Sequence, residues 1–191
     1  GSGDDTIDGG TDDDDVRGDD GNDNVSGGAG ADYIEGGAGD DILNGGDGDD
    51  TMHGNDGADT FNGGSGKDVQ YGGDGNDIFY SSTEHDDYHL GAGADTVVFE
   101  DATSFDIWDE VHGFSLANGD KLDVSDILDM AGYHDGVDAL TDYVKISNSG
   151  PHSLLRIDRD GSDTAYGFDQ IARINNVTGL TDEQALVTSG N

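Results

Sequence analysis

Residues 27–53 read GGAGADYIE GGAGDDILN GGDGDDTMH, which are three successive copies of one nine-residue pattern. The shared pattern is Gly-Gly-x-Gly-x-Asp-x-apolar-x. A short repeat at a fixed period is typical of architectures in which like units stack upon one another. Each unit supplies a glycine turn, one carboxylate and one apolar side chain, so this stretch indicates a chemistry as well as a fold.

Counting in nines in both directions gives eleven units, and all of them have Asp at the sixth position. These residues are Asp5, Asp14, Asp23, Asp32, Asp41, Asp50, Asp59, Asp68, Asp77, Asp86 and Asp95. The eighth position is apolar or aromatic in every unit except the one that has Gln70 there. The unit from Ser81 to His89 has no glycine, so its loop is the weakest candidate for a ligand site.

The residue types within the unit suit calcium. Glycine adopts positive φ without steric cost, so Gly-Gly-x-Gly can turn sharply and expose its carbonyl groups. Calcium takes six to eight oxygen ligands from carboxylates and carbonyls, at about 2.3–2.6 Å. The apolar eighth residue suits a short strand whose inward side chain is buried only when units stack. The repeat therefore predicts stacked strands joined by calcium-binding turns.

The charge of the chain predicts that it is disordered without metal. It has 44 acidic and 7 basic residues, for a formal net charge of −37. Such a density of like charges opposes compaction, and metal binding would then supply the folding free energy. An acidic surface also excludes nucleic acid bound through its phosphates. The chain has no Cys for disulfides, and no apolar run approaches the roughly 18 residues that a membrane-spanning segment needs.

The repeat resembles the glycine- and aspartate-rich RTX nonapeptide repeats of proteins exported by bacterial type I secretion, over about residues 1–98. This resemblance implies a right-handed parallel β-roll with two nonapeptides per turn and calcium held between loops two units apart. One row of ligands would contain Asp5, Asp23, Asp41, Asp59, Asp77 and Asp95, and the other Asp14, Asp32, Asp50, Asp68 and Asp86. Six and five loops leave at most about nine sites between them, and the altered unit around Asp86 lowers that number.

After Val98 the period ends, and residues 99–191 are expected to form a C-terminal cap for the open end of the roll. The cap is expected to be mainly β with one or two short helices. Strands are expected over residues 96–100, 121–124, 143–147, 153–157 and 165–174, a turn over 158–163, and helices over 125–130 and 181–187.

Two stretches beyond the repeats also resemble the family. Residues 109–128 are similar to the segment after the last repeat in secreted RTX proteases and adhesins, which implies that Asp109 completes the last calcium site. Residues 174–191 resemble the C-terminal secretion region of large RTX adhesins.

Other site chemistries fit the sequence less well. His85 and His89 have the spacing of a zinc-binding helix, but this segment is expected to be strand or loop and lacks the Glu of a metalloprotease helix. Residues 158–163 resemble the start of a helix-flanked calcium loop, but Asp169 stands where that loop needs a Glu. The Thr and Asn ladder with which some RTX adhesin segments bind ice is missing from the loops.

The sequence thus predicts a non-catalytic, monomeric calcium-binding module that supports type I secretion of a large bacterial adhesin. It would fold outside the cell, either secreted or at the bacterial surface, with calcium and the type I secretion apparatus as partners. The resemblance also fits the C-terminal module of a secreted protease, lipase or other exoenzyme. An ice-binding RTX segment and an acidic chain that never folds are lesser alternatives. Because the repeat is already running at Gly1, the chain is expected to be a piece of a longer protein.

Overall fold

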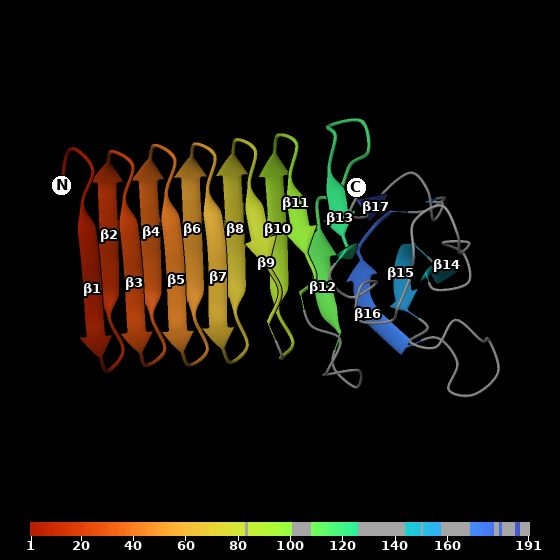
Figure 1. Cartoon of the computed structure of the whole chain (residues 1–191), viewed down its shortest axis with the longest axis horizontal. Coiled ribbons are helices and arrows are strands. Elements are labelled where there is room, and N and C mark those ends of the chain that lie inside the picture. The colour runs from red at the N-terminus through yellow and green to blue at the C-terminus, as the bar shows by residue number, and fades with distance from the viewer. Residues whose placement is uncertain are drawn as a thin grey trace.

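The computed structural model describes residues 1–82, 84–100, 108–125, 144–149, 151–157, 169–177, 180 and 186–187. Within these residues the chain forms strands that belong to two sheets. Figure 1 shows the strands side by side along the long axis of the molecule, with the N-terminus at one end and the C-terminal strands at the other.

Eleven strands come from the repeats, one from each unit. They are β1 Thr6–Thr11, β2 Asp15–Asp20, β3 Asn24–Ala29, β4 Tyr33–Ala38, β5 Ile42–Asp47, β6 Thr51–Asp56, β7 Thr60–Ser65, β8 Val69–Asp74, β9 Ile78–Tyr80, β10 Asp87–Ala92 and β11 Thr96–Val98. Odd-numbered strands form one sheet and even-numbered strands the other, and all neighbours among them pair in parallel. Each strand pairs with the strand two units later, so the expected parallel β-roll with two nonapeptides per turn is confirmed.

The register of the sheets places eighth-position residues directly above one another. Val25 pairs with Leu43, and Leu43 pairs with Phe61 one turn further on. These side chains are fully buried, and the rings of Phe61 and Phe79 stack with centroids 4.8 Å apart. Burial of one such side chain stabilises the fold by about 1.5–3 kcal/mol, and a single unit has no partner against which to gain it.

The turns contain glycines with the positive φ that the sequence predicts. At the end of β4 and directly after it, Gly37 and Gly39 have φ of 123° and 133°, a region that other L-residues rarely adopt. A Cβ at Gly37 would collide with the carbonyl of Asp19 in the previous turn. The second and fourth residues of the unit are therefore glycine both for their φ and for the close approach of stacked loops.

The C-terminal strands extend both sheets of the roll. They are β12 Asp109–His112, β13 Lys121–Asp123, β14 Val144–Ser149, β15 His152–Ile157, β16 Asp169–Ile174 and β17 Leu186–Val187. One sheet continues in parallel from β11 through β13 to β17, and the other from β10 through β12 to β16. Antiparallel β15 and β14 then complete the second sheet, so in both sheets the last repeat strand is paired with later strands.

Most of the strands expected after the repeats are confirmed, with shifted ends. The helix expected over residues 181–187 is wrong at its C-terminal end, because β17 Leu186–Val187 is a strand paired with β13. Backbone pairing with the free edge of β13 outweighs the weak helix signal of this segment. Residues 126–130 of the other expected helix, the turn over 158–163 and residues 165–168 lie outside the described residues. Among the described residues no helix is long and apolar enough to cross a membrane.

Candidate metal sites

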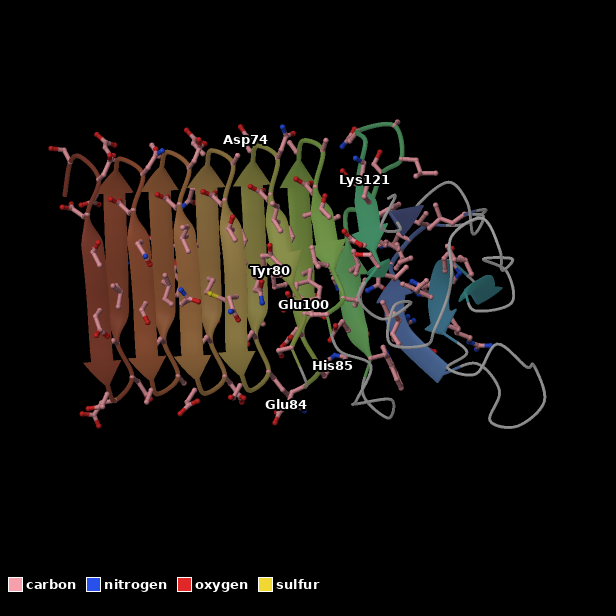
Figure 2. All side chains as sticks on the ribbon, in the orientation of Figure 1. Asp74, Tyr80, Glu84, His85, Glu100 and Lys121 are labelled. Atoms are coloured by element: carbon pink, nitrogen blue, oxygen red, sulfur yellow. The ribbon has the colours of Figure 1, made fainter. Side chains whose placement is uncertain are left out.

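The sixth-position carboxylates form two rows, which lie at opposite edges of the roll. Oδ1 of each Asp after the first in its row accepts a hydrogen bond from the backbone N–H of the Asp one turn earlier, over 2.7–3.0 Å along both rows. Figure 2 shows oxygen-tipped side chains along the loops at both edges of the strands. The structure thus brings together the residues predicted for each row, because strands of one sheet all begin at the same edge.

The second carboxylate oxygen of most of these residues is buried without a partner. Within the described part of the chain, Oδ2 accepts no hydrogen bond in nine of them, which are Asp14, Asp23, Asp32, Asp41, Asp50, Asp59, Asp68, Asp77 and Asp95. A buried anionic oxygen with no partner is costly, so buried carboxylates are normally paired or coordinate a metal. The rows therefore offer the oxygen ligands that a cation needs, and these oxygens have no other partner among the described residues.

Backbone carbonyls converge on the same places. A Cβ added at Gly45, the first residue of its unit, would collide with Oδ2 of Asp50 and with the carbonyl oxygen of Gly63. The same overlap of a carboxylate from one loop and a carbonyl from the loop one turn later recurs at Gly18. Glycine at the first position thus leaves room where oxygens of two stacked loops meet, and oxygen ligands of this kind suit calcium.

Burial makes the ionised form of these carboxylates unfavourable without a cation. Desolvation raises the pKa of Asp59 and of Asp68 to about 7, although each also accepts a backbone hydrogen bond that acts in the opposite direction. Desolvation likewise raises the pKa of Asp50, Asp77 and Asp95 to about 6. The folded roll therefore favours a bound proton or a bound cation at these sites.

In the unit without glycine, the second carboxylate oxygen has hydrogen-bond partners. Oδ2 of Asp86 accepts hydrogen bonds from the hydroxyls of Ser82, at 2.8 Å, and of Tyr88, at 3.1 Å. The Tyr88 hydroxyl also lies 3.5 Å from Oδ2 of Asp109, and burial raises the pKa of Tyr88 well above its usual value. Two hydroxyl groups thus satisfy the carboxylate oxygen that a cation would bind elsewhere in the row.

Each row continues past the last repeat. Asp109 Oδ1 accepts from the N–H of Asp86 at 3.0 Å, so Asp109 is the next carboxylate in that row. Asp120 ends the other row, with Oδ1 bonded to the N–H of Asp95 at 3.1 Å and Oδ2 to the N–H of Ser115 at 2.7 Å. Asp120 was missed because 25 residues separate it from Asp95 in place of 18. Its signal is the repeat's own Asp-x-apolar spacing, in which Leu122 follows as the core residue.

A second ladder, on the outside of the loops, was also not expected. Fifth-position Asp and Asn side chains accept backbone N–H groups one turn later, as Asn22 does from Asp40 at 3.0 Å and Asn76 from Ala94 at 2.8 Å. These side chains are exposed, so the bonds align loops without adding buried charge. The mix of Asp, Asn, Ala, Lys and His at this position conceals the pattern in the sequence.

Comparison with protein families supports the same region. The model of the RTX calcium-binding nonapeptide repeat matches in four copies, at residues 1–34, 17–52, 35–70 and 62–97. Together the copies span about half of the 191 residues. A comparison with curated proteins gave no match. The matched part is the part that holds strands β1–β11 and both carboxylate rows as far as Asp95.

Proposed function

Because the chain belongs to the RTX calcium-binding nonapeptide repeat family, its repeats bind calcium, and we propose that this binding switches the chain from an unfolded polyanion to a folded β-roll. The observation that carries the proposal is the set of nine buried Oδ2 atoms without a hydrogen-bond partner among the described residues. They mark the sites where a cation would bind buried carboxylate oxygens that no hydrogen bond satisfies.

The proposed calcium ions lie between loops one turn apart. Each would take carboxylate oxygens from the two rows of sixth-position Asp residues, with Asp109 at the end of one row, and carbonyl oxygens from the glycine turns. Fewer than about nine ions are bound, since the hydroxyls of Ser82 and Tyr88 already satisfy Oδ2 of Asp86.

Calcium concentration then decides where the chain folds. Calcium modules of extracellular proteins bind at about 10⁻⁴–10⁻³ M, which is far above the level in the cytosol. Inside the cell a net charge of −37 keeps the chain extended, and outside it calcium both neutralises the carboxylates and links the turns. The binding free energy of the metal thereby becomes folding free energy.

In this proposal residues 1–98 are the calcium-binding roll, and residues 99–191 are a cap that includes the region used in type I secretion. The module is non-catalytic and monomeric, and it serves a large adhesin that is secreted or held at the bacterial surface. The same module on a secreted exoenzyme is the alternative. The gene sequence upstream distinguishes them, because tandem adhesin repeats support the first and a catalytic motif the second.

Circular dichroism with and without millimolar calcium tests the switch. We expect a cooperative gain of β signal on adding calcium, and its absence would overturn the proposal. Asp50→Asn keeps an acceptor for the N–H of Asp32 but removes the charge at a buried site, so it should raise the calcium midpoint several-fold. Asp47→Asn removes an exposed charge from the same unit and serves as the matched control. Equal midpoints for the two variants would contradict the assignment of Asp50 as a ligand.

A further inference from the structure

The outer face of the second sheet carries a column of stacked rings. His53, Tyr71, His89 and His112 pair in register on β6, β8, β10 and β12, and we call these four residues the ring ladder. Successive centroids lie 4.4–4.6 Å apart, with rings within 14° of parallel. The residues just before three of these rings, Met52, Tyr88 and Val111, are buried in the core, so the ladder lies on the opposite face of the sheet.

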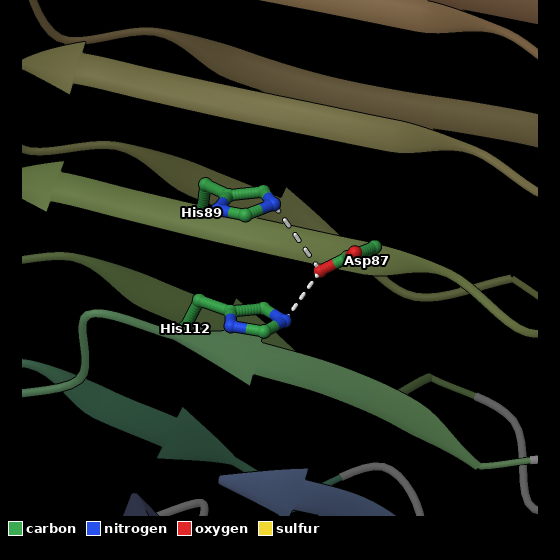
Figure 3. Close-up of side chains that lie close together, drawn as sticks. All are labelled: Asp87, His89 and His112. Atoms are coloured by element: carbon green, nitrogen blue, oxygen red, sulfur yellow. Dashed lines mark ion pairs between the residues drawn. The ribbon is translucent and has the colours of Figure 1, made fainter. Parts of the chain in front are cut away.

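At its C-terminal end the ring ladder meets two carboxylates. Asp87 and His89 lie two residues apart on β10, and Glu110 and His112 lie opposite them on β12. Oδ1 of Asp87 is 2.9 Å from Nε2 of His112 and 3.4 Å from Nε2 of His89, and Oε2 of Glu110 is 3.5 Å from Nε2 of His112. Figure 3 shows both imidazoles directed at one oxygen of Asp87. Two imidazoles and two carboxylates thus occupy one corner of the sheet.

The hydrogen bonds of this corner depend on which imidazole nitrogens carry a proton. The polar neighbours of the buried Oδ1 of Asp87 are Nε2 of His112 and Nε2 of His89, and each can donate to it only in the tautomer protonated at that nitrogen. Asp87 and Glu110 are also directly opposite each other, where two like charges destabilise a sheet. Nη1 of Arg173, 3.5 Å from Oε1 of Glu110, offsets part of this repulsion. A cation between the two carboxylates would remove the rest of it and bind Oδ1 of Asp87.

We propose that Asp87, His89 and His112 bind a divalent transition metal of the zinc class, with Glu110 as the fourth ligand. One potential ligand atom from each of the first three residues lies within 4.8 Å of the others. Zinc bonds of about 2.0–2.2 Å to nitrogen and oxygen place tetrahedral ligand atoms about 3.3–3.6 Å apart. Oδ1 of Asp87 is already near that spacing from both imidazole nitrogens, so the remaining adjustment is in the two imidazoles. The two stacked imidazoles must also open from their angle of 9° so that their lone pairs converge.

The surroundings allow that movement while holding the ligands in place. The side chains of Asp87, His89 and His112 are about one-third exposed, so they can turn without disturbing the core. Parallel pairing of β10 with β12 fixes the backbone positions from which they project. Asn175, from the loop after β16, lies at the same corner: its Nδ2 donates to Oε2 of Glu110 at 2.9 Å and lies 3.1 Å from Nε2 of His112. Its amide must therefore turn aside when a metal takes these two atoms.

The chemistry separates this site from the calcium rows. Imidazole ligands suit zinc, copper, nickel and iron, whereas calcium selects oxygen ligands alone. The site also joins β10 of the last repeats to β12 of the cap, which are 23 residues apart at Asp87 and Glu110. A metal here would fasten the cap to the roll independently of calcium.

The test is a titration of the full chain with cobalt(II) in saturating calcium, so that the roll is folded and its oxygen sites are filled. We expect one equivalent of cobalt to give the intense visible absorption of a four-coordinate ion, and one equivalent of zinc to abolish it. His89→Gln and His112→Gln should lower the affinity at least 10-fold, since each removes a ligand. His53→Gln is the matched control, because it lies in the same ring ladder with Tyr71 as its neighbour in place of a second imidazole.

Circular dichroism of each variant in calcium confirms that the roll is intact, and Asp87→Asn offers a third variant that leaves the rings in place. The proposal is overturned if the natural chain shows no such absorption in excess calcium. It is also overturned if His112→Gln and Asp87→Asn bind cobalt as tightly as the natural chain, or if His53→Gln weakens binding as much as they do.

Discussion

Gln70 lies in the core of the roll between Met52 and Tyr88, its register partners one turn before and after. It is fully buried, and neither Oε1 nor Nε2 has a hydrogen-bond partner among the described residues. An unpaired buried amide lowers stability, while an apolar side chain of similar size gains from the same position.

We therefore expect Gln70→Leu to raise the free energy of unfolding by about 1–3 kcal/mol. Denaturant unfolding in saturating calcium measures the change. Gln70→Glu is the opposing variant, because it places a charge in the same space and should destabilise the roll. A loss of stability in Gln70→Leu would show that the amide has a partner that the packing does not reveal.

Two members of the carboxylate rows should respond differently to removal. Asp41→Ala deletes a carboxylate whose Oδ2 has no protein partner in the described chain, so the calcium midpoint should rise about 10-fold. Asp86→Ala deletes one that two hydroxyls already satisfy, so the midpoint should change by less than about 2-fold. Calcium titrations of both variants, followed by circular dichroism, compare them. Equal shifts would mean that Asp86 binds calcium as the other residues do.

At the scale of the element, the glycine-containing turns of the roll share one backbone requirement at the second residue of the unit. That residue has positive φ whether it is Gly37, at 123°, or Asn55, at 78°. The two positions are equivalent in successive turns, since Gly37 pairs with Asn55 in the register of β4 and β6. A substitution at either one tests the demand for glycine in this turn.

Opposite changes at this position should have opposite effects. Gly37→Ala should cost at least about 1–2 kcal/mol, because alanine is strained at positive φ and its Cβ would collide with the carbonyl of Asp19. Asn55→Gly should gain up to about 1 kcal/mol by removing the strain of a side chain in this region. Thermal unfolding in calcium measures both. A stabilised Gly37→Ala variant would contradict the steric argument.

The repeats could be predicted from the sequence because almost every unit places the same residue types at the same positions. Asp41, Leu43 and the turn at Gly37 each follow from backbone, ligand or packing chemistry that acts within one unit and its neighbours. The cap could be predicted less well, since its strands depend on contacts over long separations. Leu186 and Val187 form a strand only because β13 offers them an edge, and nothing in residues 181–187 encodes that edge.

The same distinction applies to the candidate sites. Both carboxylate rows could be located by counting, but Asp120 could not, because the chain between it and Asp95 departs from the period. The cluster of Asp87, His89 and His112 was also out of reach, since it needs the register of β10 with β12. The sequence argued against His85 and His89 as a metal-binding pair, and the structure places His112 beside His89.

At the scale of the whole molecule, protons should partly substitute for calcium. In the folded roll the pKa of Asp50, Asp77 and Asp95 is raised to about 6, and that of Asp59 and Asp68 to about 7. A carboxyl with a raised pKa in the folded state contributes stability that is fully present below its unfolded value of about 4 and is lost as the pH rises through 6–7.

Acidification should therefore favour the roll in the absence of calcium. In a calcium chelator, we expect the β signal to increase as the pH falls from 8 toward 5, because protonation removes the cost of buried charges and of the net charge together. Circular dichroism measures the gain, and analytical ultracentrifugation distinguishes a compact monomer from an aggregate. A monomer that stays unfolded at pH 5 would contradict this expectation.

The two ends of the roll lie at opposite ends of its long axis, so a pull between them acts across the strands (Figure 1). Such a load reaches the links between neighbouring turns one turn at a time, rather than shearing all of a sheet's hydrogen bonds at once. A released turn of 18 residues lengthens from a spacing of about 4.8 Å to about 60 Å. Stretched in this direction, the folded repeats form a chain of extensible links that yield in succession and close again while calcium is present.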